Sequence, residues 1–96
     1  MGNYALSRKA DADIESIAEF SLQRWGPTRA EQYILGLHET FRVLAEFPDL
    51  ERNASDIRPG YRKIETASHS VFYRKTATGV LIVRVLHQHM DFRRHL

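Results

Sequence analysis

Apolar residues recur every three to four positions in two stretches of the first half of the chain, the spacing of α-helices with one buried face. The first predicted helix follows Ser7, which can cap it, and ends at Gly26-Pro27. The second begins at Thr28, which forms a capping-box pattern with Glu31, and ends before Pro48. Helices with so short a connection pack as an antiparallel hairpin. The predicted buried positions are Ala10, Ile14, Ile17, Ala18, Ser21, Leu22 and Trp25, then Ala30, Tyr33, Ile34, Leu37, Phe41, Leu44, Ala45 and Phe47.

Strand patterns lie on both sides of the helices. Residues 3–7 alternate polar and apolar side chains, and residues 49–60 form a polar loop that holds Pro59-Gly60. Three further strands are predicted at 61–66, 69–75 and 80–87, the last two joined by a hairpin loop over 76–79. The order β-α-α-β-β-β predicts one α+β domain over residues 1–96. We expect the helical hairpin to pack on one face of a small, twisted, mainly antiparallel sheet whose other face is partly open.

The last predicted strand has two faces, because successive side chains alternate. We assign the more apolar set to the helix side: Leu81, Val83, Val85 and His87. The opposite set is Val80, Ile82, Arg84 and Leu86. Arg84 on the open face indicates either a groove for an anion or an acidic peptide, shared with Arg62 and Arg74, or an internal ion pair, for example with Glu65 or Asp91.

Composition and charge narrow the class of protein. A chain of 96 residues is too short for a (β/α)8 barrel, and the lack of cysteine excludes disulfides, cysteine-based zinc sites and thiol nucleophiles. No apolar run approaches the length of a membrane span, and the first residues lack the pattern of a signal peptide. From Arg58 onward, eight basic residues against two acidic ones give +6. Such a basic half suits an acidic partner, either a nucleic acid or a protein segment, or is a solvated face.

Histidines near the end of the chain are candidates for chemistry. His87, His89 and Asp91 have the types and spacing of metal ligands, and the run is similar to the H-x-H-x-D-H motif of metallo-β-lactamase-type hydrolases. Phe92 replaces the last histidine of that motif, so we expect no metal and place Asp91 at the N-cap of a short helix over 92–96. A histidine at position 69, 87 or 89 beside an arginine could also provide the acid–base and phosphate-stabilising groups of a metal-independent ribonuclease.

Segments along nearly the whole chain resemble one known family. They are Tyr4–Ser7, Arg24-Trp25-Gly26, Ile57–Arg62 (IRPGYR), His69–Arg74 (HSVFYR) and Ile82–Gln88 (IVRVLHQ) with Met90-Asp91 and Arg94-His95-Leu96. Together they resemble the ParE toxins of bacterial type II toxin–antitoxin modules, within the RelE/ParE superfamily.

The resemblance implies both a fold and a function. The fold is the β-α-α-β-β-β arrangement reached above. The function is that of a cytoplasmic bacterial toxin, not an enzyme and without a cofactor, that inhibits DNA gyrase. A ParD-like antitoxin with a ribbon–helix–helix half and a disordered tail would neutralise it in a hetero-oligomer, with DNA bound only through antitoxin or gyrase and no contact with a membrane.

We expect two sets of site residues. The target surface is predicted at Arg58, Tyr61, Arg62, Arg74, Arg84, His87, His89, Met90 and Asp91. Antitoxin contacts are predicted at Tyr73, Ile82, Arg84 and Leu86. One alternative is a ribosome-dependent messenger RNA nuclease of the RelE type, although the terminal tyrosine common in that branch is missing from residues 88–96. Another is a non-toxic antitoxin-binding or co-repressor module.

Overall fold

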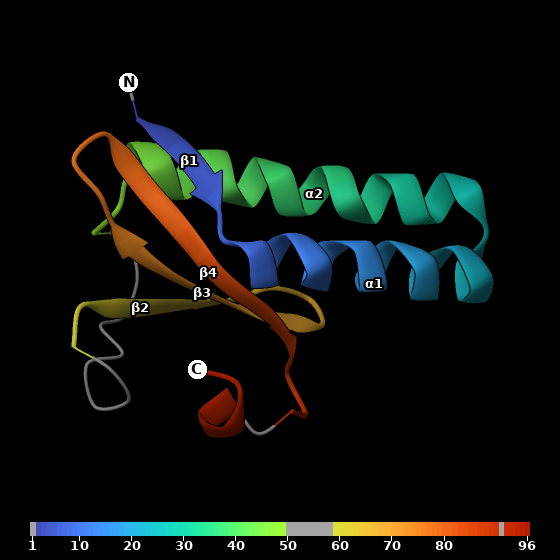
Figure 1. The fold of residues 1–96 in the computed structure, drawn as a ribbon. Coiled ribbons are helices and arrows are strands. Elements are labelled where there is room, and N and C mark those ends of the chain that lie inside the picture. The colour runs from blue at the N-terminus through green and yellow to red at the C-terminus, as the bar shows by residue number, and fades with distance from the viewer. Residues whose placement is uncertain (1, 50–58, 91) are drawn as a thin grey trace.

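Two helices lie on one face of a four-stranded sheet, and a short 3-10 helix lies on the side of the sheet away from them (Figure 1). The computed structural model describes residues 2–49, 59–90 and 92–96. Along the chain the elements are β1 (Asn3–Leu6), α1 (Arg8–Trp25), α2 (Pro27–Glu46), β2 (Tyr61–Glu65), β3 (His69–Lys75), β4 (Gly79–His87) and η1 (Phe92–Arg94). The predicted α+β class and element order are confirmed.

The sheet has the strand order β1-β4-β3-β2. The pairs β2–β3 and β3–β4 are antiparallel, as hairpin connections require, whereas β1 runs parallel to β4. β4 is therefore a central strand, with β3 along its whole length and β1 along its first half, from Gly79 to Ile82.

The helical hairpin turns at a single residue. Gly26 has φ 86°, a left-handed conformation that glycine adopts without strain, and it separates α1 from α2. Ser7 caps α1 as predicted, since its Oγ accepts the amide of Ala10 at 3.0 Å. The predicted capping box is wrong: α2 begins at Pro27, and Thr28 lies inside its first turn with no side-chain cap on the helix. Proline suits this first position because it has no amide hydrogen to leave unpaired.

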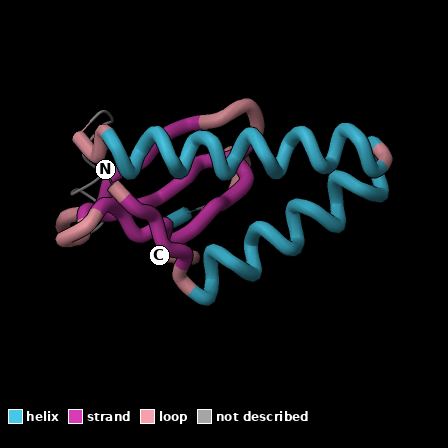
Figure 2. The backbone as a smooth tube through the Cα atoms, turned by 90° about the horizontal axis from the view of Figure 1, so that it is seen from above, coloured by secondary structure: helices cyan, strands magenta, loops and turns pink. Residues whose placement is uncertain are grey.

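Figure 2 shows the two helices joined at one end and diverging toward the other, which is the end where the strands lie. The joined end projects past the sheet. Leu22, Trp25 and Phe47 were predicted to be buried, yet they are 49%, 37% and 57% exposed. For Leu22 and Trp25 the reason is this projection, because the four described strands do not extend beneath the last turn of α1. Neither helix is long and apolar enough to cross a membrane, as far as the described part of the chain goes.

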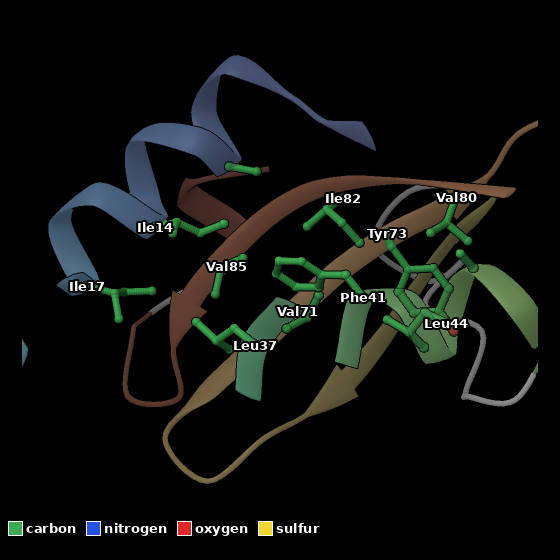
Figure 3. Close-up of a cluster of buried hydrophobic side chains, with 12 residues drawn as sticks. Ile14, Ile17, Leu37, Phe41, Leu44, Val71, Tyr73, Val80, Ile82 and Val85 are labelled. Atoms are coloured by element: carbon green, nitrogen blue, oxygen red, sulfur yellow. The ribbon is translucent and has the colours of Figure 1, made fainter. Parts of the chain in front are cut away.

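The hydrophobic core lies between the helices and the sheet (Figure 3). Phe41 is at its centre and is completely buried, with other side chains from α1, α2, β3 and β4 around it. The labelled members are Ile14, Ile17, Leu37, Phe41, Leu44, Val71, Tyr73, Val80, Ile82 and Val85.

A β-bulge in β4 changes which side chains face this core. Phe72 pairs with Arg84 but Tyr73 pairs with Ile82, so Val83 is an extra residue in the ladder. Val80 and Ile82 therefore face the helices before the bulge, and Val85 faces them after it. Our assignment of Val85 to the helix side is confirmed, and the assignment of Val80 and Ile82 to the open face is wrong.

The outer face of the sheet is less open than predicted. Phe72 and Leu86 are opposite Arg84 and Ser70 respectively, and both are buried although neither belongs to the helix-side core. The C-terminal segment, residues 92–96, lies on this side (Figure 1), and Nη1 of Arg84 donates to the backbone oxygen of His95 at 2.9 Å.

Candidate functional site

β3 pairs with one edge of the second half of β4, and α1 lies along the other edge, where β1 has ended. β1 ends at Leu6, opposite Ile82. Beyond that point the amide of Ser7 donates to the Ile82 oxygen at 2.9 Å and its hydroxyl donates to the Val83 oxygen at 2.7 Å. One turn and a half further on, Oδ2 of Asp13 accepts the amide of Val85 at 3.0 Å. The amide and hydroxyl of the N-cap Ser7 and the side chain of Asp13 on α1 thus make hydrogen bonds that a longer β1 would make.

A groove of about 590 Å³ begins where these hydrogen bonds stop. One wall is the C-terminal half of α1, and the other is the end of β4 with the turn before β3 and the turn after β4. Its apolar members include Ile17, Phe20 and Trp25 from α1 and Val85 from β4. The complete lining is Asp13, Ser16, Ile17, Phe20, Ser21, Arg24, Trp25, Ser68, His69, Val85, Leu86, His87 and Met90.

Aromatic side chains at the joined end of the hairpin extend this surface. Phe20 is 59% exposed and packs edge-to-face against Trp25, with 6.5 Å between ring centroids. Arg29 lies over the Trp25 ring at 5.8 Å, and Tyr33 lies 6.1 Å from it. A second, smaller hollow, lined by Trp25, Arg29, Gln32, Tyr33, Ala67 and Ser68, adjoins the groove at Trp25 and Ser68. Exposed aromatic rings in a concave surface are typical of a protein-binding site.

Histidines form part of the sheet-side wall. The ring of His69 is T-shaped to His87, with centroids 5.4 Å apart, and His87 lies 5.0 Å from His89. Nδ1 of His69 lies 2.5 Å from the hydroxyl of Tyr33. Burial lowers the pKa of His69, and the nearby His87 lowers it further, against an opposite effect of Asp13. This wall therefore presents a neutral ring at His69 near pH 7.

Arg84 is part of an internal ion pair, one of the two alternatives that its position in the strand indicated. Nε and Nη2 donate to the two oxygens of Asp13, each at 2.8 Å, and the two side chains are only 13% and 14% exposed. These hydrogen bonds raise the pKa of Arg84 above its ordinary value. Of the two suggested partners of Arg84, Glu65 is wrong, because it contacts Lys63 and Ser70 instead. The other, Asp91, lies outside the described residues.

The described members of the predicted target surface separate into different places. His87 and Met90 line the groove, with His89 exposed beside them. Tyr61 and Arg84 line a hollow on the outer face together with His95 and Leu96. The other described members are Arg62, which is paired with Asp49 at 3.0 Å, and Arg74, which is exposed; Arg58 and Asp91 lie outside the described residues.

The predicted antitoxin contacts were chosen on the expectation of an open outer face, and the structure buries or pairs these side chains instead. Tyr73 and Ile82 are 0% exposed on the helix side of the sheet, Leu86 is 2% exposed, and Arg84 is held by Asp13. The exposed apolar side chains that line the groove include Phe20 and Trp25, which were not among the predicted site residues. The signal was present in the sequence, because Phe20, Leu22 and Trp25 put more apolar surface on α1 than one buried face can hold.

No group of three or more potential ligands that could hold a metal ion occurs among the residues that the structure describes. His87 and His89 lie side by side, but Asp91, the third ligand of the spacing pattern, is outside that set.

Comparisons with known proteins give the family. The model of the ParE toxin of the type II toxin–antitoxin system parDE matches residues 4–92. Toxin ParE1 of Mycobacterium tuberculosis is 45% identical over 94 residues, which cover 97% of this chain and 96% of the relative. Toxin ParE1 of Caulobacter vibrioides is 44% identical over 96 residues, covering 100% and 99%. A solved chain of the chromosomal ParDE system from P. aeruginosa has the same fold, with a TM-score of 0.75 at 22% identity over 91% of this chain and 96% of that one. The chain therefore belongs to the ParE toxin family of type II toxin–antitoxin systems.

Proposed function

We propose that this protein inhibits DNA gyrase in the bacterial cytoplasm and that a ParD-like antitoxin neutralises it by direct binding. The observation that carries the proposal is the similarity over nearly the whole chain to relatives named as ParE toxins, at 44–45% identity. In this proposal the protein acts by binding and not by catalysis.

The groove suits the tail of such an antitoxin. It offers apolar surface at Phe20 and Trp25, a guanidinium at Arg24 and two histidines, and a neighbouring guanidinium at Arg29. An amphipathic helix places apolar side chains at intervals of three to four residues and fits such a groove, while acidic side chains on its flanks would meet the arginines. Binding would cover exposed aromatic rings that are unfavourable in water.

In this proposal gyrase binds the other side of the molecule, around Tyr61 and the C-terminal segment. This side carries a hollow lined by Arg8, Lys9 and Tyr61 beside His95 and Leu96, and Arg74 is exposed on the adjacent strand. A cationic surface of this kind suits an acidic protein or the DNA held by gyrase. The antitoxin and gyrase would then contact different faces.

The test is a supercoiling assay with purified gyrase, relaxed plasmid and purified toxin. We expect the wild-type chain to block supercoiling, and we expect a purified ParD-like antitoxin that binds it to restore supercoiling. Arg42→Gln, which changes an exposed pair on α2 with both side chains more than half exposed, is the matched control and should inhibit like the wild type.

Other outcomes would select the alternatives. Unimpaired supercoiling together with cleavage of messenger RNA on ribosomes would replace the proposal with a RelE-type nuclease that uses His69, His87 and Arg24 in the groove. Neither activity, with tight antitoxin binding, would indicate the non-toxic module.

A further inference from the structure

Arg84 lies where three parts of the molecule meet. From β4, its Nε and Nη2 reach Asp13 on α1, while Nη1 reaches the backbone oxygen of His95 in the C-terminal segment. One planar guanidinium therefore joins the helix that forms the groove wall to the segment on the outer face. A lysine cannot reproduce this arrangement, because its ammonium group lacks the fixed fork of donors.

Asp13 is held in place by more than Arg84. Its Oδ2 also accepts the amide of Val85 at 3.0 Å, and the start of α1 is tied to β4 by the two hydrogen bonds of Ser7. The carboxylate is thus fixed relative to the sheet. It determines the direction of the Arg84 side chain, and Arg84 in turn determines where His95 lies.

Burial distinguishes this bridge from the surface ion pairs of the molecule. Arg84 and Asp13 are 13% and 14% exposed, whereas Arg42 and Glu39 on α2, joined at 2.6 Å, are 67% and 59% exposed. Hydrogen bonds between ionised groups are strong where water is largely excluded, and exposed pairs contribute little. The bridge can therefore hold a short chain segment that the exposed pair could not.

We propose that Asp13 and Arg84 are positioning residues that fix the C-terminal segment, residues 92–96, against the outer face of the sheet. Their loss reduces toxicity without either side chain contacting the target. The effect on toxicity rests on the proposed function, because it takes this segment as part of the gyrase-binding surface. The positioning itself does not depend on that function.

The first measurement is of backbone mobility in the purified chain by 15N relaxation. In Arg84→Gln and in Asp13→Asn, the order parameters of residues 93–96 should fall from those of rigid backbone, about 0.85, toward the flexible range below about 0.6. Arg42→Gln should leave them unchanged. Arg84→Lys keeps a positive charge beside Asp13, so it should fold even if Arg84→Gln does not, and it should also loosen the segment.

The second measurement separates positioning from stability. Hydrogen exchange at the core amides of β3 should remain as slow in the variants as in the wild type, while the toxin concentration needed to inhibit gyrase rises by about tenfold or more, the loss expected from one charge-assisted hydrogen bond. Unchanged order parameters, or exchange that accelerates equally in β3, would overturn the proposal. A loosened segment in a chain whose wild type does not inhibit gyrase would instead support the positioning and reject the proposed function.

Discussion

The two halves of α1 carry the same kind of side chains and have different environments. Ile14 and Ile17, in the middle of the helix, are buried against the sheet, whereas Phe20 and Trp25, one and two turns later, are 59% and 37% exposed. Figure 2 shows why, because the joined end of the hairpin extends past the strands. The half over the sheet supports the fold. The projecting half leaves Phe20 and Trp25 partly exposed, and in the proposed function these side chains bind the antitoxin.

Substitution in the core should give the largest effect and tests the first half of this comparison. Phe41 is fully buried and packs against Tyr4, with ring centroids 5.5 Å apart. We expect Phe41→Ala to lower the free energy of unfolding by about 3–5 kcal/mol, measured by urea denaturation. Leu35→Ala on the same helix, where the side chain is 60% exposed, is the control and should change it by less than about 0.5 kcal/mol. Equal losses in the two variants would mean that the helix is buried differently from the way the structure shows.

Substitution at the projecting end of α1 should lower antitoxin affinity and leave the free energy of unfolding nearly unchanged. Trp25→Ala removes the ring that Phe20 and Arg29 contact at the border of the two hollows. Buried tryptophans are often the strongest contributors to an interface, so we expect antitoxin affinity to fall by about thirtyfold, measured by calorimetry, with little change in stability. Leu35→Ala, which lies outside both hollows, again serves as control. Unchanged affinity in Trp25→Ala would remove the groove from the proposed function.

The helices and strands could be predicted from the sequence because each depends on local spacing. Local sequence signals all four features: the cap at Ser7, the end of the second helix before Pro48, the turn at Gly26 and the strand at residues 69–75. The family resemblance added the function class, which the comparisons confirm at the level of the ParE toxin family.

The faces of β4 and the partner of Arg84 could not be predicted in this way. The sequence of residues 80–87 contains no signal for a bulge. Val83 becomes the extra residue only through the pairing with β3, in which neighbouring residues of β3 pair with Ile82 and Arg84. Asp13 lies 71 residues from Arg84, in an early turn of α1, where the helix dipole favours an acidic side chain whatever its other contacts. Its role depends on β1 being too short to reach Val85, which is a property of the sheet and not of either residue.

A smaller effect is expected at the junction between the sheet and the buried half of α1. Ser7 caps the helix and also donates to the Val83 oxygen at 2.7 Å. We expect Ser7→Ala to cost about 0.5–2 kcal/mol of the free energy of unfolding, as a lost N-cap does. Thr28→Ala is the control, because Thr28 lies inside the first turn of α2 and makes no cap. If Thr28→Ala were the more damaging variant, the start of α2 would be at Thr28 after all.

The smallest expected effect is a dependence of stability on pH that comes from His69. This side chain lines the groove opposite α1, where the buried and the projecting halves of the helix meet. Because burial and His87 lower the pKa of His69 in the folded state, protons bind the unfolded chain more tightly. The stabilising contribution is complete above the ordinary pKa of 6.5 and is lost as the pH falls from there toward the lower pKa of the folded state. Unfolding free energies of the wild type should therefore decrease over this interval.

The variant His69→Gln identifies the group responsible. Its side chain does not titrate, so the difference in unfolding free energy between wild type and variant should shrink as the pH falls below 6.5. The hydroxyl of Tyr33 can donate to Nδ1 of His69 only while that nitrogen is unprotonated, so Tyr33→Phe should cost more stability at pH 7.5 than in acid. The difference in unfolding free energy between wild type and His69→Gln could instead stay constant with pH. That result would show that the His69 ring is protonated as easily in the folded chain as in the unfolded one, and it would contradict the lowered pKa of His69.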